Sequence, residues 1–263
     1  IVEEGARVAA VEATASGVRW TFSPMLDVAR DPRWGRVAEG SGEDTYLDVQ
    51  MGLAMVKGYQ GADLSDPTAM AACIKHFVGY GAAEGGRDYN STMISERSLR
   101  NTYFPAFKAA ADAGAATLMT SFNEIDGIPS TGNKWLLKDV LRDELGFDGF
   151  VVSDYDAVHE MVYHGVAKDG KDAARMALEA YLNMEMTSGD YINHGEELVE
   201  EGVIPESLLD ELCRNILVAK YELGLFENPY RYGGKERFRK AIYKPEAMEL
   251  ARQIARESMV LLK

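Results

Sequence analysis

The chain has 263 residues and a formal net charge of -14, from 28 lysines and arginines against 42 aspartates and glutamates. A chain this acidic repels phosphate backbones and anionic lipid headgroups, so we expect neither a nucleic acid nor a membrane as a partner. Its two cysteines, Cys73 and Cys213, lack the paired spacing of zinc or redox motifs and are expected to be small buried hydrophobic residues.

Both ends of the chain have the pattern of interrupted elements. Residues 1–16 show helical periodicity with no capping residue before them, which predicts further residues upstream. At the other end, a predicted helix over residues 245–257 runs into residues 259–263, which are typical of the start of a strand. We therefore expect the chain to be part of a longer protein.

Between the ends, short β-prone segments alternate with amphipathic helices. The expected strands are nearly continuous in apolar residues, as buried parallel strands are, and cover residues 18–24, 71–78, 116–122, 150–153 and 183–186. The expected helices cover residues 43–59, 95–113, 134–145, 171–182, 195–201 and 205–223. Repeated strand–helix units predict a parallel sheet, either doubly wound or closed into a barrel.

Polar residues follow directly after every expected strand, and this favours the barrel. They are Asp27 and Arg30, then residues 79–90, 123–126, 154–156 and 187–190. In a (β/α) barrel such loops meet at one face, where catalytic groups lie. We predict an α/β fold with a TIM-like (β/α) barrel over residues 1–227 that is incomplete at its N-terminus. Residues 228–263 are predicted to form a linker and the beginning of a second α/β domain.

Asp154 stands at the end of the apolar segment 150–153. A carboxylate there is costly to desolvate unless it is paired, hydrogen-bonded or functional. One interpretation is that Asp154 caps the helix that follows. The other is that Asp154 is a nucleophile held at the mouth of the barrel.

Lys75 and His76 close another buried segment, residues 71–74, on positions expected to face opposite sides of the strand. Both side chains can donate hydrogen bonds to sugar hydroxyls. The alternative is a structural pair between the lysine and an aspartate, because buried charges are usually paired. A metal-dependent hydrolase would need clustered ligands at the strand ends, and only His76 qualifies, so we expect no metal and no cofactor.

Residues 27–36 pack three arginines and a tryptophan into one loop. Arginine and aromatic side chains suit the binding of carbohydrate hydroxyls. They serve equally well to hold a long loop in place through Glu39, Glu43 or Asp44, and composition does not separate the two roles.

Taken together, these segments resemble the N-terminal barrel domain of glycoside hydrolase family 3, in its β-glucosidase branch. The matching stretches occur in the family's order and are residues 22–36, 43–44, 75–77, 85–89, 119–123, 135–138 and 152–155. A second branch, the β-N-acetylhexosaminidases, uses an Asp–His pair in the loop after the Lys-His strand. Here that loop, residues 79–90, contains no histidine.

The resemblance implies a retaining, exo-acting β-glycosidase that removes terminal β-D-glucosyl residues from a β-glucoside or oligosaccharide through a covalent bond to Asp154. Arg36, Lys75 and His76 match positions that hold the hydroxyls of the sugar, and Met119 matches a residue that packs against it. Tyr155, in the substrate site, stands where many members have tryptophan.

The resemblance also implies partners outside the chain. The acid/base of this branch is typically a glutamate of a following domain, and bacterial members are often periplasmic or secreted. Two alternatives stay open: a catalytically inactive barrel that only binds sugar, and a β-xylosidase of the same family.

Overall fold

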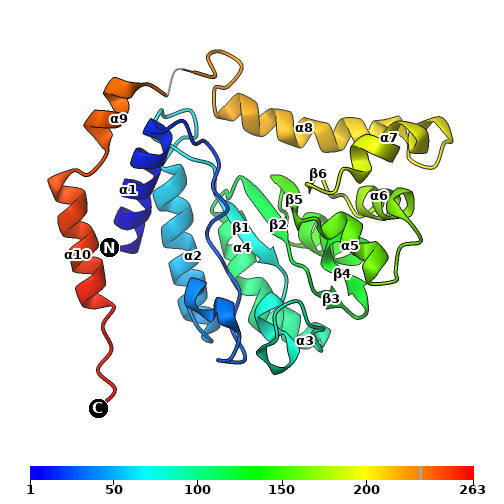
Figure 1. Ribbon diagram of the computed structural model, residues 1–263, viewed down its shortest axis with the longest axis horizontal. Coiled ribbons are helices and arrows are strands. Elements are labelled where there is room, and N and C mark those ends of the chain that lie inside the picture. Colours follow the sequence, from blue (N-terminus) through cyan, green and yellow to red (C-terminus); the bar gives the residue numbers. More distant parts are fainter. Residues whose placement is uncertain (231–232) are drawn as a thin grey trace.

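The computed structural model describes residues 1–230 and 233–263. At its centre lies a parallel sheet in the order β1 (Cys73–Phe77), β2 (Thr117–Thr120), β5 (Phe150–Tyr155) and β6 (Met184–Met186) (Figure 1). A short antiparallel hairpin of β3 (Glu124–Ile125) and β4 (Ile128–Pro129) follows β2. Because the four long strands are parallel, their carboxyl ends lie along one edge of the sheet.

Helices cover and connect the strands. Before the hairpin they are α1 (Val2–Ala15), α2 (Thr45–Gln60), α3 (Glu96–Ser98) and α4 (Phe104–Asp112), with a π-helical stretch, Leu99–Tyr103, between the last two. After it come a second π-helical stretch, Trp135–Glu144, then α5 (Ala157–Tyr163), α6 (Gly170–Glu179), α7 (Asp190–Glu200), α8 (Glu206–Glu222), α9 (Lys235–Ala241) and α10 (Pro245–Glu257). No helix of the described residues combines the length and the apolar character that a bilayer crossing requires.

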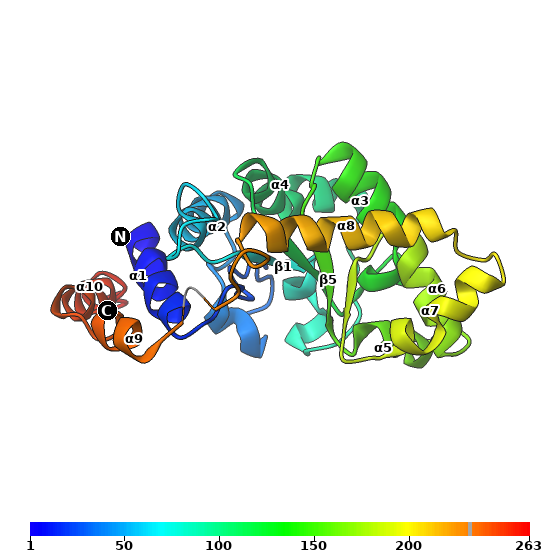
Figure 2. The same cartoon turned by 90° about the horizontal axis from the view of Figure 1, so that it is seen from above.

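The two faces of the sheet are both buried, which explains why its strands are apolar throughout. Ile74, Leu118 and Val151 belong to the main core, which includes Phe107 of α4 and Leu136. The alternate residues of the strands form a separate cluster that contains Cys73, Met119, Val152 and Ala219 of α8. Figure 2 shows α8 lying across the strands on this side.

The predicted strand over residues 18–24 is only partly correct. This segment runs parallel to β1 and is hydrogen-bonded to it, with Cys73 N donating to Ser23 O at 3.0 Å, but it makes only isolated bridges at Trp20 and Met25. Pro24 offers no backbone N–H, so the ladder is interrupted. The described sheet is open at both edges.

The other predicted strands and helices lie close to their expected places. Helix α5 lies directly after β5, where the capping interpretation of Asp154 assumes a helix without giving its bounds, whereas the short helix α9 was not expected from the sequence pattern. The predicted strand at residues 259–263 is wrong for this structure: those residues are exposed and form no strand. A strand needs a neighbouring strand to complete its hydrogen bonds, and none lies beside this segment among the described residues.

The expected domain division after residue 227 stays a prediction. Helices α9 and α10 pack against α1 rather than against the sheet (Figure 1). Arg231 and Tyr232 of the predicted linker lie outside the described residues.

Gln60, at the end of α2, ties together the starts of β1 and β2. Its Oε1 accepts hydrogen bonds from Ala72 N at 3.2 Å and Ala116 N at 2.9 Å, and its Nε2 donates to Gly114 O at 2.8 Å. Gln60→Met is expected to destabilise the fold by roughly 2–4 kcal/mol, because it leaves these backbone groups without partners. Denaturant unfolding measures the loss. The control Gln50→Met, on the exposed side of the same helix, should change little, and equal effects of both variants would contradict this role.

Candidate active site

Three residues from distant parts of the chain meet at the carboxyl edge of the sheet. Asp27 follows the extended segment beside β1, His76 lies in β1, and Asp154 lies in β5. Asp27 Oδ2 accepts hydrogen bonds from His76 N at 3.1 Å and from His76 Nδ1 at 2.7 Å. On the other side of the ring, His76 Nε2 lies 3.4 Å from Asp154 Oδ2. The imidazole thus bridges two carboxylates, and a ring that carries both protons can donate to each of them.

Asp154 presents one carboxylate oxygen that is not hydrogen-bonded. Its Oδ1 accepts from Tyr155 N at 2.7 Å, whereas Oδ2 is buried and has no hydrogen-bond partner within the described part of the chain. Asp154 does not cap α5, because Asp156 occupies the N-cap position of that helix. The capping interpretation is therefore wrong, and the position of Asp154 at the end of a buried strand needs another explanation.

Lys75 is not the partner of a structural aspartate. In the described residues its ammonium group forms no ion pair, and the buried pair at this edge is that of His76 with Asp27. Burial raises the pKa of the Cys73 thiol to about 12. A hydrogen bond with Thr117 and the charge of Lys75 oppose this increase, and the charge of Asp154 contributes to it. Lys75 and Asp154 thus act on the same buried thiol, and both lie near it. A peptide bond in the cis form joins Lys75 to His76.

Arg36 lies in a short 3-10 helix, Gly35–Glu39, at the edge of this group. Its Nε and Nη2 donate to the two carboxylate oxygens of Glu39 at 2.6 and 2.9 Å, so part of its role is to hold the loop. Its guanidinium carbon lies 5.5 Å from the centre of the Tyr80 ring, which in turn lies 5.2 Å from the His76 ring. The hydrogen bond from Arg36 lowers the pKa of the Glu39 carboxyl, and the charges of Lys75 and His76 lower it further.

The remaining two predicted residues lie in different surroundings. Met119, in β2, is almost fully buried and packs with Cys73 and Val152 on the α8 side of the sheet. Tyr155 follows Asp154 at the end of β5, and its side chain is 63% exposed. Within the described residues the Tyr155 ring makes no hydrogen bond or ring contact.

The structure therefore brings His76 and Asp154 into direct contact, places Arg36 and Lys75 near them, and leaves Tyr155 at the rim.

Sequence patterns missed several neighbours of Asp154. Burial raises the pKa of Tyr89, and the charges of Glu160 and Asp154 raise it as well. Burial also raises the pKa of Glu160, with smaller contributions from the charges of Asp156 and Asp154. The Tyr89 ring packs against Phe122 with centroids 4.6 Å apart, which gives the rim an aromatic surface. Among these neighbours, only Asp27 could be recognised in the sequence, because it is a polar residue directly after an expected strand.

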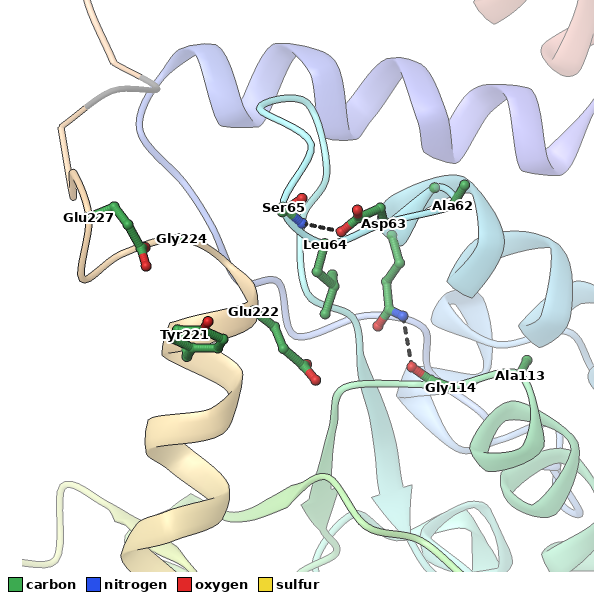
Figure 3. Close-up of a pocket in the computed structure, with 12 residues that line it drawn as sticks. Ala62, Asp63, Leu64, Ser65, Ala113, Gly114, Tyr221, Glu222, Gly224 and Glu227 are labelled. Atoms are coloured by element: carbon green, nitrogen blue, oxygen red, sulfur yellow. Dashed lines mark hydrogen bonds between the residues drawn. The ribbon is translucent and has the colours of Figure 1, made fainter.

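A cavity of about 660 Å³ lies at the opposite end of the sheet (Figure 3). Its walls are residues 61–65 after α2, Gly114 just before β2, and Tyr221 and Glu222 at the end of α8. Residues 61–65 and Gly114 precede the strands β1 and β2, whereas parallel barrels place their chemistry after the strands. The candidate active site is therefore the edge that carries Asp154.

Comparisons with known proteins identify the family of the chain. The model of the "Glycosyl hydrolase family 3 N terminal domain" matches residues 1–219. The chain is 45% identical to the periplasmic beta-glucosidase of Salmonella typhimurium over 260 residues, which is 98% of this chain and 34% of that protein. It is 38% identical to a putative beta-xylosidase of Formosa agariphila, over 96% of this chain and 34% of that protein.

Solved structures resemble the fold closely. The beta-glucosidase of Listeria innocua in complex with glucose matches with a TM-score of 0.96 and 50% identity, over 100% of this chain and 36% of that one. A mutant of the same enzyme in complex with laminaribiose matches with a TM-score of 0.98 and 49% identity, over 100% of this chain and 37% of that one. The chain spans about a third of the length of the relatives it matches. The predicted α/β, TIM-like class is confirmed, and the chain belongs to glycoside hydrolase family 3, whose N-terminal domain it carries.

Proposed function

We propose that the protein to which this chain belongs is a retaining, exo-acting β-glucosidase and that Asp154 is its nucleophile. The observation that carries the proposal is the buried Oδ2 of Asp154 at the end of β5, which accepts no hydrogen bond from the described residues and lies 3.4 Å from His76 Nε2. A nucleophilic carboxylate needs such an oxygen, held in place and not consumed by hydrogen bonds. Family membership and the glucose-bound Listeria innocua structure support a glycoside as substrate.

In the proposed reaction, Asp154 Oδ2 attacks the anomeric carbon as the bond to the leaving oxygen breaks, and a general acid protonates that oxygen. A water molecule then attacks the same carbon, gives its proton to the same acid/base group and releases Asp154. Retention requires the two carboxyl groups to lie about 5–5.5 Å apart. We assign the acid/base to a following domain of the longer protein, which is also the proposed partner of this barrel.

Arg36, Lys75 and His76 are the proposed donors to the sugar hydroxyls. Each is positively charged or can become so, and they surround a site with three carboxylates, Asp27, Glu39 and Asp154. Met119 and Tyr155 are the proposed apolar and aromatic contacts, in the wall and at the rim. The similarity to a periplasmic beta-glucosidase supports a periplasmic or secreted location.

Activity on β-xylosides is the second candidate, because relatives named beta-xylosidases match nearly the whole chain. A xyloside lacks only the hydroxymethyl group of a glucoside, so the same nucleophile and donors serve both. Comparing kcat/KM for the two aryl glycosides decides between them.

The test of the proposal is to treat the full-length protein with 2,4-dinitrophenyl 2-deoxy-2-fluoro-β-D-glucoside and to locate the label by peptide mass spectrometry. The good leaving group departs without acid help, so labelling reports the nucleophile alone. We expect one glycosyl label per active site, on the peptide that contains Asp154. A label on another carboxylate contradicts the assignment. A folded protein that binds glucose saturably but stays unlabelled favours the inactive sugar-binding barrel.

A further inference from the structure

Asp48 is a buried carboxyl group that the proposed reaction does not use. It lies one turn into α2, after Asp44, whose Oδ1 accepts from Leu47 N at 2.7 Å and caps the helix. Asp48 faces inward and is only 1% exposed. The loop that carries Asp27 is fastened to the start of this helix, because Ala29 N donates to Gly42 O at 2.9 Å.

The carboxyl groups of Asp48 and Asp27 both have unused oxygens. Neither oxygen of Asp48 has a hydrogen-bond partner among the described residues, and the same holds for Asp27 Oδ1. Burial and the charge of Asp27 raise the pKa of Asp48 to about 7, and the nearby Ser41 hydroxyl opposes this only in part. Two neighbouring buried carboxyl groups without a cation between them avoid repulsion when one of them keeps its proton.

The other charged groups around α2 do not neutralise Asp48. Helix α2 packs against α1 and α4. From α1, Arg7 lies at the far end of α2, near Asp66. From the π-helical stretch before α4 comes Tyr103, whose pKa burial raises, with Arg30 opposing. In the described chain, Asp27 is the titratable group whose charge acts on Asp48.

We propose that Asp48 is a positioning residue for the nucleophile: its protonated carboxyl donates a hydrogen bond to Asp27 Oδ1 and so keeps Asp27 Oδ2 on His76. A chain of contacts then connects Asp48 on helix α2, through Asp27 and His76, to the reacting oxygen of Asp154. With the proton on Asp48, the Asp27 carboxylate is held from both sides and the His76 ring is fixed against Asp154. When Asp48 ionises, two negative charges face each other and this support is lost. The inference rests on the proposed role of Asp154.

The test compares the pH dependence of labelling by the same fluoroglucoside in the full-length wild-type protein and in Asp48→Asn. The amide of asparagine keeps a donor for Asp27 but cannot ionise. Labelling of the wild type should slow by about tenfold or more between pH 6.5 and 8.5, as the proton leaves Asp48. Labelling of Asp48→Asn should change by less than about twofold over the same range, and at pH 6.5 the two proteins should react at similar rates. Circular dichroism at both pH values checks that each protein is folded.

Two results overturn the inference. One is the same alkaline decrease in both proteins, which assigns the decrease to another group. The other is slow labelling of folded Asp48→Asn at every pH, which means that the site needs a charge at position 48. In both cases the wild type is still labelled on Asp154, so the proposed function stands. A wild type that is not labelled at all overturns the proposed function itself.

Discussion

Asp154→Ala in the full-length protein is expected to lower kcat for aryl β-glucosides by about 10⁴-fold or more, the order seen when the nucleophile of a hydrolase is removed. The side chain lies at the end of β5, where among the described residues only Tyr155 N donates a hydrogen bond to it, so its removal breaks little of the fold. Steady-state kinetics measure the loss, and an unchanged thermal unfolding profile shows that the structure survives.

The matched control is Asp156→Asn, two residues further along the same turn. Asp156 has a φ of 60°, which asparagine tolerates, and no substrate role is proposed for it, so its kcat should stay within a few-fold of wild type. A sharper readout is rescue by azide. In the space left by Asp154→Ala, azide attacks an activated β-glucoside and gives the α-glucosyl azide. Normal turnover by Asp154→Ala would reject the assignment outright.

The sequence alone indicates that the candidate active site lies at this edge of the sheet, because two physical signals coincide there. Parallel strands buried on both faces are continuous in apolar residues, and a charged residue directly after such a strand is costly unless it has a purpose. Asp154 and His76 satisfy both conditions. The family resemblance then added Arg36 and Met119, for which the residue pattern alone offers only the alternatives of loop support and core packing.

The partners of these residues could not be predicted in the same way. His76 pairs with Asp27, 49 positions away, and no local periodicity records a contact over that separation. Asp48 looks like an ordinary polar residue of an amphipathic helix until the fold buries it where the charge of Asp27 contributes to raising its pKa. The prediction of a continuous strand over residues 18–24 was wrong for a local reason. The apolar residues of this segment favour a strand, but Pro24 has no backbone N–H and interrupts the hydrogen-bond ladder.

Asp48→Asn is expected to stabilise the protein, by an amount that grows with pH. In the folded protein the pKa of Asp48 rises from 3.8 to about 7. Below pH 3.8 both the folded and the unfolded chain hold the proton, and this group adds no difference between wild type and variant. Between pH 3.8 and 7 the unfolded wild-type chain releases the proton while the folded chain retains it, so the free energy of unfolding falls. The total loss, complete above pH 7, is about 4 kcal/mol at 1.36 kcal/mol per pKa unit.

Asparagine does not titrate, so Asp48→Asn avoids this loss. The free energy of unfolding of the variant should exceed that of wild type by about 1–2 kcal/mol at pH 5 and by about 4 kcal/mol at pH 8. The difference grows as the pH rises from 3.8 to the pKa of Asp48 in the folded protein and is constant above it. Melting temperatures of the full-length protein at the two pH values measure the difference, which should appear as a clearly larger increase at pH 8. Asp126→Asn, at an exposed turn, serves as the control and should show no such dependence. An Asp48→Asn variant that is no more stable than wild type at pH 8 would mean that folding does not raise the pKa of Asp48, and Asp48 would then hold no proton at pH 6.5 with which to support Asp27.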